Sequence, residues 1–252
     1  MTKSFKHSGA FGDLIYGLAL VKHFGGGDFY LHLNQIDWIG YHYYGSKPNP
    51  IHQGRLNEQD YEFMYDFILD LPYIHKFNIL TPDVEITHNL DRFRPLFVGH
   101  PGNYVDIYAT VFGIRDVGTQ TMMRNTAWLE VKNPKRIART VINRTNRWLP
   151  PQLSPVWSES DWSKDAVFIG LDNEYTDFVR TTGYDIEHYP THTMLEMAEV
   201  IAGSDRFVGN QSSALALAIG LGKDFWCERR TDLPIERNEC YFPNHPNGNY
   251  FA

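Results

Sequence analysis

The start of the chain most constrains the fold, because a short strand, a glycine turn and an apolar helix follow one another there. The stretch KSFKHSGAFGDLIYGLALVKHF has a run ending at His7, then turn residues, then apolar residues at helical spacing. Glycines let a backbone turn tightly and a ligand approach closely, and a helix start offers unpaired N–H groups. Gly12 and Asp13 are therefore predicted at the mouth of a ligand-binding turn. The Asp13 carboxylate there either caps the helix or acts as a base.

Strand and helix patterns alternate along the rest of the chain. The predicted strands are 29–33, 74–79, 83–87, 95–98, 139–143, 165–171, 206–208 and 225–227, and the predicted helices are 60–71, 104–112, 173–182, 193–202 and 214–221. Such alternation indicates parallel sheets joined by crossover helices. With 252 residues, the chain has room for two domains. We predict an α/β protein with two facing Rossmann-like domains.

The domain boundaries are predicted from where the breaker residues gather. Gly, Thr, Asn and Pro collect near 115–138, which predicts a linker there. The first domain is then 1–120 and the second 135–252. The stretch 238–252 is rich in Pro and Gly, and it is expected to run as an extended strap that crosses between the domains.

The charge and the cysteine content indicate which classes of partner and which cellular compartment to expect. A net charge of −7 argues against a protein dominated by nucleic-acid backbone contacts, but Arg136, Arg139, Arg144 and Arg147 form a basic cluster that keeps a nucleic-acid partner open. The chain has 2 cysteines, which is typical of a reducing compartment. It has no signal-peptide layout and no apolar run of the ~20 residues that a membrane span needs. We expect a cytoplasmic protein, and the sequence leaves its oligomeric state open.

A second ligand-binding turn is predicted late in the chain, in SDRFVGNQSSALALAIGLG. A strand ends near Gly209, and Ser212 and Ser213 fall at the start of a helix of small residues. Their hydroxyls and the free N–H groups can hold a phosphate. The alternative is a plain serine cap without a ligand.

Residues 34–57 form a long predicted loop rich in aromatic residues. Tyr43 and Tyr44 in this loop can stack on sugar rings or on nucleobases, or they can simply pin the loop to the core. His100 begins a His-Pro-Gly-Asn turn on the same side, which makes it a candidate for acceptor contact.

Three segments together resemble glycosyltransferase family 9, the lipopolysaccharide heptosyltransferases. HSGAFGDLIYGLALVK is similar to the opening of that family, VINRTNRWLP is similar to its diphosphate-facing strand end, and MLEMAEVIAGSDRFVGNQSSALALAIGLGK is similar to its late segment. The resemblance covers roughly a third of the chain, in the family's order. It implies the two-domain GT-B fold and an inverting transfer of a sugar from a nucleotide-diphosphate donor. It also implies a glycan or another hydroxyl-bearing molecule as acceptor, and no catalytic metal or cofactor.

The resemblance also implies roles for individual residues. Asp13 matches the family's general base, and Arg144 and Arg147 stand where basic residues neutralise the leaving diphosphate. Glu174, after the strand DAVFIGL, matches the ribose-binding glutamate. The alternatives are a helix cap for Asp13, a solvated basic turn for the arginines, and a helix-dipole acid for Glu174.

Two departures leave the donor open. The late turn reads Asn210-Gln211-Ser212-Ser213 where the family has Asp-Thr/Ser-Gly, and arginine stands where most relatives have lysine. Two alternatives therefore remain beside the transferase. One is a degenerate or binding-only protein of the same fold, and the other is a nucleotide-sugar epimerase of the same architecture.

Overall fold

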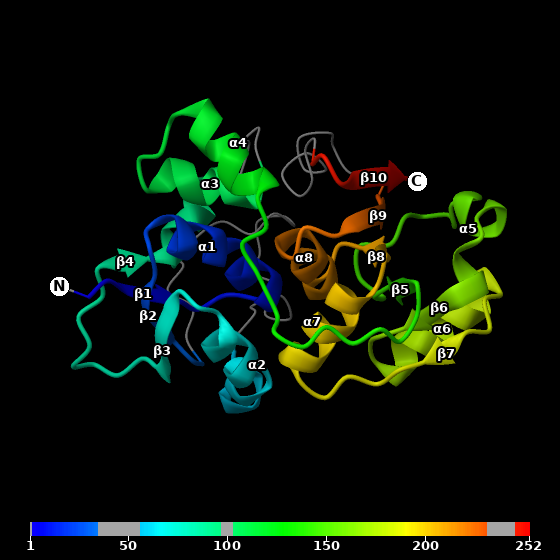
Figure 1. Ribbon diagram of the computed structural model, residues 1–252, viewed down its shortest axis with the longest axis horizontal. Helices are drawn as coiled ribbons and strands as arrows, with labels where there is room; N and C mark the ends of the chain where they lie inside the picture. The colour runs from blue at the N-terminus through cyan, green and yellow to red at the C-terminus, as the bar shows by residue number, and fades with distance from the viewer. Residues whose placement is uncertain (1, 35–55, 97–102, 231–244) are drawn as a thin grey trace.

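Two parallel sheets, each covered by helices, make up the part of the chain that the structure describes (Figure 1). The structure is a computed structural model, and it describes residues 2–34, 56–96, 103–230 and 245–252. Every strand pairing in these ranges is parallel. The prediction of an α/β fold with two parallel sheets is confirmed.

The N-terminal sheet has the strand order β3-β2-β1-β4 in the described residues. Its elements are β1 (Ser4–His7), α1 (Phe11–His23), β2 (Gly27–Leu31), α2 (Glu58–Asp70), β3 (Ile74–Ile79), β4 (His88–Asn89), the 3-10 helix η2 (Leu90–Leu96), α3 (Tyr104–Val111) and α4 (Val117–Asn125). The amides of Asn57 and Asn103 cap α2 and α3, and in each case an aspartate three residues later completes a capping box. Local sequence therefore fixes where these helices begin.

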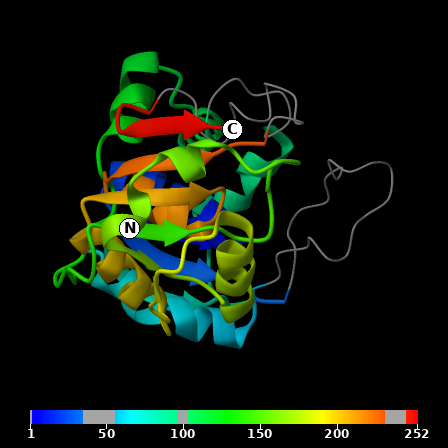
Figure 2. The same ribbon diagram turned by 90° about the vertical axis from the view of Figure 1, so that its right-hand side faces the viewer.

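The C-terminal sheet has the order β10-β9-β8-β5-β6-β7, and Figure 2 shows its strands stacked edge to edge. Its elements are β5 (Thr140–Asn143), α5 (Val156–Glu159), the 3-10 helix η3 (Trp162–Asp165), β6 (Ala166–Phe168), α6 (Asp172–Thr182), β7 (Glu187–His188), α7 (Met194–Gly203), β8 (Arg206–Asn210), α8 (Ser213–Gly220), β9 (Asp224–Glu228) and β10 (Gly248–Phe251). The carboxyl ends of β5 and β8 lie side by side, with Asn143 opposite Gly209. This places the two turns that follow these strands next to each other.

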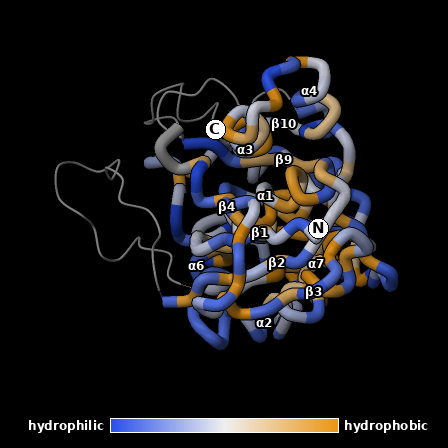
Figure 3. Tube along the Cα trace, turned by 90° about the vertical axis from the view of Figure 1, so that its left-hand side faces the viewer, coloured by the Kyte–Doolittle hydropathy of each residue, from blue (hydrophilic) through white to orange (hydrophobic). Residues whose placement is uncertain are grey.

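Alternating residues of the C-terminal strands serve two different cores. Val141 and Phe207 face a cluster that they share with α7 and α8, whereas Ile142 and Val208 face a cluster around Trp157. The first cluster does not stop at the sheet. It continues through α1 to Phe5 and Phe29 of the N-terminal sheet, because α1 packs directly against α8. Figure 3 shows hydrophobic stretches around α1 at the centre of the molecule.

The tail is extended where the structure describes it, as the sequence predicts: β10 adds a parallel edge strand to the C-terminal sheet beside β9. Residues 238–244 of the predicted strap lie outside the described residues, so its crossing between the domains stays a prediction. Phe251 explains this position, because its ring packs between those of Trp157 and Trp162. The apolar contacts of one residue outweigh the polar composition of the stretch around it.

Two local predictions were wrong. Residues 83–87 form no strand, and the fourth strand of the sheet is β4, immediately after them. The predicted strand 95–98 falls partly on η2 and partly outside the described residues. The predicted linker contains α4, a helix that the sequence analysis did not predict; Asp116 caps it, and Met123 is its one buried residue. The predicted domains 1–120 and 135–252 each contain one of the two sheets, and the boundaries themselves stay a prediction.

No helix within the described ranges combines the length and the apolar character that a bilayer crossing requires.

Candidate functional site

Asp13 lies in the first turn of α1, at the third helical position. Ala10 is the N-cap residue and makes no side-chain cap, so Asp13 is not the cap residue of this helix. Asp13 is half-buried. A Cβ built on the neighbouring Gly12 would meet no heavy atom of the described chain within 4 Å. The glycine therefore leaves open space beside the carboxylate-bearing residue.

A buried chain of hydrogen bonds holds both ends of this turn. The N–H of Gly9 donates to Nδ1 of His7 at 2.9 Å, and Nε2 of His7 lies 2.8 Å from the hydroxyl of Tyr108. That hydroxyl donates to the main-chain oxygen of Asp13 at 2.9 Å. Because Nδ1 accepts from Gly9, the proton of neutral His7 is assigned to Nε2, where it donates to Tyr108. We call Gly9, His7, Tyr108 and Asp13 the Asp13 hydrogen-bond chain.

Charged side chains gather next to this turn, at the carboxyl ends of β1 and β2. Asp91 is buried, and its Oδ1 accepts from the N–H of Ser8 at 3.1 Å. Burial lowers the pKa of Lys6, and the nearby Asp91 carboxylate partly offsets this. Burial and the charge of Lys6 also lower the pKa of His32, again against the effect of Asp91. Two basic groups and one carboxylate therefore border the Asp13 turn.

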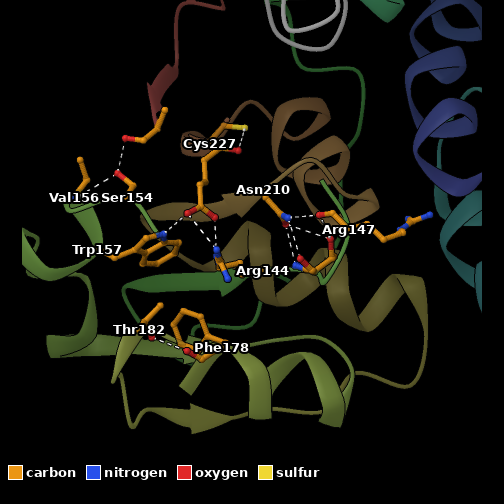
Figure 4. A network of polar contacts seen from close by, with 12 residues as sticks. Arg144, Arg147, Ser154, Val156, Trp157, Phe178, Thr182, Asn210 and Cys227 are labelled. Carbon is orange, nitrogen blue, oxygen red and sulfur yellow. Dashed lines mark hydrogen bonds and ion pairs between the residues drawn. The ribbon is translucent and has the colours of Figure 1, made fainter. Parts of the chain in front are cut away.

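The turn that follows β5 contains Thr145 and Arg147, and we call it the C-terminal turn. The buried amide of Asn210, at the end of β8, clamps this turn by hydrogen bonds to its main chain. Its Oδ1 accepts from the N–H of Thr145 at 2.9 Å, and its Nδ2 donates to the carbonyls of Thr145 at 3.0 Å and Arg147 at 2.6 Å. Figure 4 shows this contact between the two neighbouring turns. Because Asn210 must donate to carbonyls, an aspartate could not replace it in this arrangement. The amide at position 210 therefore has a structural role in this turn.

Backbone strain lies next to the clamp. Trp148 has a φ of 59°, in the left-handed region that non-glycine residues rarely adopt. Such strain persists only where surrounding contacts hold the backbone, and it gathers at functional sites. The clamped turn is therefore a preorganised segment.

Arg144 forms a buried ion pair instead of facing the solvent. Its Nε donates to Oε2 of Glu228 at 2.6 Å and its second guanidinium contact is 3.3 Å long, while only 5% of its side chain and 0% of that of Glu228 are exposed. The indole N–H of Trp157 donates to the same carboxylate at 2.9 Å. Arg147 differs, since its side chain is exposed and points away from this pair in Figure 4. The geometry favours Arg147 over Arg144 as a ligand for an anion.

Ser212 and Ser213 lie at the start of α8, as the sequence predicts. Ser212 is the N-cap residue, and its hydroxyl accepts from the N–H of Leu215 at 3.2 Å. Ser213 is the first helical residue and is half-buried. Within the described ranges, no side chain is hydrogen-bonded to the Ser213 hydroxyl. One serine therefore caps the helix, and the other lies in its first turn, at the positive end of the helix dipole.

Glu174 lies at the start of α6 and caps it through one carboxylate oxygen. Oε2 accepts from the N–H of Leu171 at 3.2 Å. The bare backbone of Gly170 separates Glu174 from Asn143, since a Cβ there would lie 3.1 Å from Oε2 of Glu174 and 2.9 Å from the amide nitrogen of Asn143. Gly170 has a φ of 143°, which only glycine adopts readily. Glu174 can stabilise the start of α6 and also bind a ribose, because the capping contact uses only one of its two carboxylate oxygens.

The arginine cluster of the sequence does not form one basic surface. Arg136 and Arg139 both pair with Asp205, and Arg144 pairs with Glu228. Of the four, only Arg147 makes no ion pair among the described residues. A continuous basic groove for a nucleic acid is therefore not formed by these four residues.

No group of three His, Cys, Asp or Glu side chains in the described ranges is arranged to hold a metal ion. Tyr43, Tyr44 and His100, predicted on the acceptor side, lie outside the described residues, so their contacts stay predictions.

Sequence reasoning missed the partners that hold the site residues. It favours a structural role for His7 without naming its partners, it does not single out Tyr108 or Glu228, and it places Asn210 in a turn although Asn210 ends β8. Each of these contacts joins residues at least 63 positions apart. No local spacing could have shown them. The usable signal in the sequence is a polar residue at the end of an otherwise apolar strand, as at His7 and Asn210, because such a residue needs a hydrogen-bond partner when it is buried.

Comparison with known proteins gives matches by fold and not by sequence. No protein-family model matches the chain, and no curated protein matches it. The crystal structure of the glycosyl transferase family 9 from Veillonella parvula DSM 2008 has a TM-score of 0.62 at 9% identity, covering 98% of this chain and 84% of that one. The structure of E. coli heptosyltransferase WaaC with ADP has a TM-score of 0.58 at 11% identity, covering 99% and 92%.

A third solved structure agrees with these two. E. coli ADP-heptose lps heptosyltransferase II has a TM-score of 0.52 at 8% identity and covers 99% of this chain and 90% of its own. The similarity in fold therefore extends over nearly the whole chain. The resemblance drawn from the sequence is confirmed at the level of fold: the chain has the architecture of the family 9 glycosyltransferases, which include the lipopolysaccharide heptosyltransferases.

Proposed function

We propose that this protein is an inverting, metal-independent glycosyltransferase that moves a sugar from a nucleotide-diphosphate donor to an acceptor hydroxyl. The observation that carries the proposal is the pairing of two strand–turn–helix units, whose helices α1 and α8 pack against each other. The fold is shared with a heptosyltransferase solved with ADP and with ADP-2-deoxy-2-fluoro heptose. One unit carries a carboxylate and the other an anion-binding helix start.

In the proposed mechanism, Asp13 is the general base. Its carboxylate takes the proton of the acceptor hydroxyl as that oxygen attacks the anomeric carbon of the donor sugar. The bond from this carbon to the diphosphate breaks on the opposite face, which inverts the configuration. Three features support this role: Asp13 is half-buried, it is not the N-cap residue of α1, and open space borders it at Gly12.

The leaving diphosphate is assigned to Arg147, Ser212 and Ser213. Negative charge develops on the leaving phosphate oxygen, so preorganised donors near that oxygen lower the barrier. The first turn of α8 supplies N–H groups, and the guanidinium of Arg147 supplies charge. Arg144 supports these groups indirectly, since its pair with Glu228 fixes the end of β5.

Glu174 is assigned to the ribose of the donor, with the oxygen that does not cap α6. On the acceptor side, Gly12 gives access to Asp13, and Tyr43, Tyr44 and His100 are proposed to contact the acceptor. Three of the four arginines in the basic cluster are already paired, which favours a glycan over a nucleic-acid acceptor.

The test begins with a panel of nucleotide-diphosphate sugars measured by thermal shift. A ligand that binds only the native state must raise the melting temperature. The donor that does so is then incubated with candidate acceptors, with and without EDTA, and the released nucleoside diphosphate is measured. We expect release that depends on the acceptor and persists in EDTA.

The same measurements separate the alternatives. Conversion of the donor sugar without an acceptor would indicate an epimerase. A thermal shift without turnover would indicate a binding-only protein, which is the outcome that the use of Asn210 as a clamp would explain. Turnover that EDTA abolishes would overturn the metal-independent mechanism.

A further inference from the structure

We propose that His7 and Tyr108 are positioning residues for Asp13, and that without them the base is present but misplaced. This inference rests on the proposed function, because it concerns the residue assigned as the base. It goes beyond that function by naming two buried residues, on β1 and α3, that contact neither donor nor acceptor in the proposed mechanism.

The first step is that the Asp13 hydrogen-bond chain has a single direction. The Asp13 carbonyl only accepts, so Tyr108 must donate to it, and the Tyr108 oxygen is left to accept from Nε2 of His7. Nδ1 of His7 in turn accepts from Gly9. Each group has one role that agrees with the next, so the chain joins the two ends of the Gly9–Asp13 turn in a fixed geometry.

The second step is that the side chains of His7 and Tyr108 in this hydrogen-bond chain are buried, although the contact at Asp13 itself is only partly buried. Neither His7 nor Tyr108 exposes any of its surface, and the ring of Phe93 lies 4.5 Å from that of Tyr108. Hydrogen bonds in such surroundings are stronger than at a surface, and leaving one unmade costs more.

The third step is that α1 is shaped to receive Tyr108. A Cβ on Gly17, one turn after Asp13, would lie 3.3 Å from Cζ of the Tyr108 ring and 3.3 Å from Leu90. That is closer than most real contacts of a Cβ atom, so a side chain at 17 would press the ring away. Glycine at this position lets the hydroxyl reach Asp13.

The fourth step is that the N-cap residue of α1 makes no side-chain cap. The N-cap Ala10 provides no side-chain hydrogen bond, whereas Asn57, Asn103, Thr193 and Ser212 cap their helices. The contact from Tyr108 thus takes the place of a cap in holding the first turn. Since the carboxylate and the bound carbonyl belong to the same residue, loosening one displaces the other.

The experiment compares Tyr108→Phe with a matched control, Tyr73→Phe. Tyr73 is also buried, and its hydroxyl donates to the carbonyl of Trp128 at 2.8 Å, away from Asp13. With the donor found by thermal shift, Tyr108→Phe should lower kcat by about tenfold to a hundredfold, because small misplacements of a reacting group cost this much. The donor KM should change less than twofold, since donor-binding residues are untouched. The control should keep its kcat.

The decisive arm repeats Tyr108→Phe in an Asp13→Asn background. If Tyr108 acts by placing the carboxylate, it should lower kcat no further once that carboxylate is gone. An equal loss in both backgrounds would overturn the proposal and leave Tyr108 a general structural residue. Unchanged kcat in Tyr108→Phe alone would overturn it too.

A second pair of variants covers poor folding of Tyr108→Phe. His7→Gln keeps an N–H donor toward Tyr108, whereas His7→Asn keeps only the acceptor toward Gly9. The glutamine variant should retain the higher kcat, and equal values would contradict the proposal. Wild-type protein that turns over no donor would instead contradict the proposed function, so the two failures are distinguishable.

Discussion

The two turns that carry the candidate site are held by different side chains. The Asp13 turn is held by an imidazole and a phenol that reach it from β1 and α3, and the buried Asp91 carboxylate accepts from the adjoining Ser8. The C-terminal turn is held by the amide of Asn210, and the buried Arg144–Glu228 ion pair lies beside it. A buried carboxylate thus lies beside each turn, and beside the second it is paired with a guanidinium. The stability of the second turn should therefore depend on a buried charge.

Asp13→Asn removes the carboxylate from the first of these two turns, and it has the largest expected effect. Turnover should fall by about 10²–10⁴, the usual contribution of a positioned general base. The melting temperature should hardly change, because Ala10 and not Asp13 is the N-cap residue. Release of nucleoside diphosphate measures the turnover, and thermal denaturation measures the melting temperature. Normal turnover would remove Asp13 from the mechanism, and a large loss of melting temperature would favour the capping role.

Arg144→Met tests whether the C-terminal turn depends on its buried charge. Glu228 would keep only the hydrogen bond from Trp157, so the free energy of unfolding should fall by about 3–5 kcal/mol. Urea denaturation measures this. The matched control is Arg136→Met, which removes a surface partner of Asp205 and should change the melting temperature little. Equal stabilities of the two variants would show that the buried pair is not needed.

Asn210→Asp replaces the clamp by a group that cannot donate when ionised. The carbonyls of Thr145 and Arg147 would face a carboxylate, and the free energy of unfolding should fall by about 1–3 kcal/mol at neutral pH. The folded-state pKa of the new carboxyl would be raised, so the loss should be small below about pH 4 and grow as the pH rises above it. Asn146→Asp adds the same charge to an exposed position of this turn and should be nearly neutral. A pH-independent loss would contradict this account.

Arg147→Ala sharpens the contrast with Arg144 and has the smallest expected effect. Donor affinity should weaken roughly tenfold, the value of a hydrogen bond to a charged group. Stability should persist, because the bond from Asn210 reaches the main chain of residue 147 and not its side chain. Titration calorimetry with the nucleoside diphosphate measures this, and Arg139→Ala serves as the control. Equal affinities in both variants would remove Arg147 from the diphosphate site.

The sequence predicted the fold well wherever local patterns were strong. The strand at 74–79 was found at Ile74–Ile79, and the first helix follows its turn as expected. Short or polar elements could not be predicted. β7 is only Glu187–His188, and α4 is held by its cap and by an ion pair from Arg124 to Asp106. Their existence depends on neighbours that a window of sequence does not contain.

The candidate site was predictable in its positions and not in its contacts. Residues Asp13, Ser212 and Ser213 lie where turn and helix signals place them, because those signals are local. Arg144 and Arg147 look equivalent in sequence, yet one is buried against Glu228 and the other is exposed. Only tertiary structure separates them, since Glu228 is 84 residues away from Arg144.

The hydrophobic cluster that joins the two sheets through α1 and α8 also has a consequence for folding. Each half of the chain contributes one side of a shared core, so neither half alone can remove that apolar surface from water. The two sheets should therefore form a single cooperative unit, with the slowest hydrogen exchange at the amides of α1 and α8. Nascent chains that stop before α8 would leave one face of α1 exposed, so folding of the N-terminal sheet would be completed only after most of the chain has been synthesised.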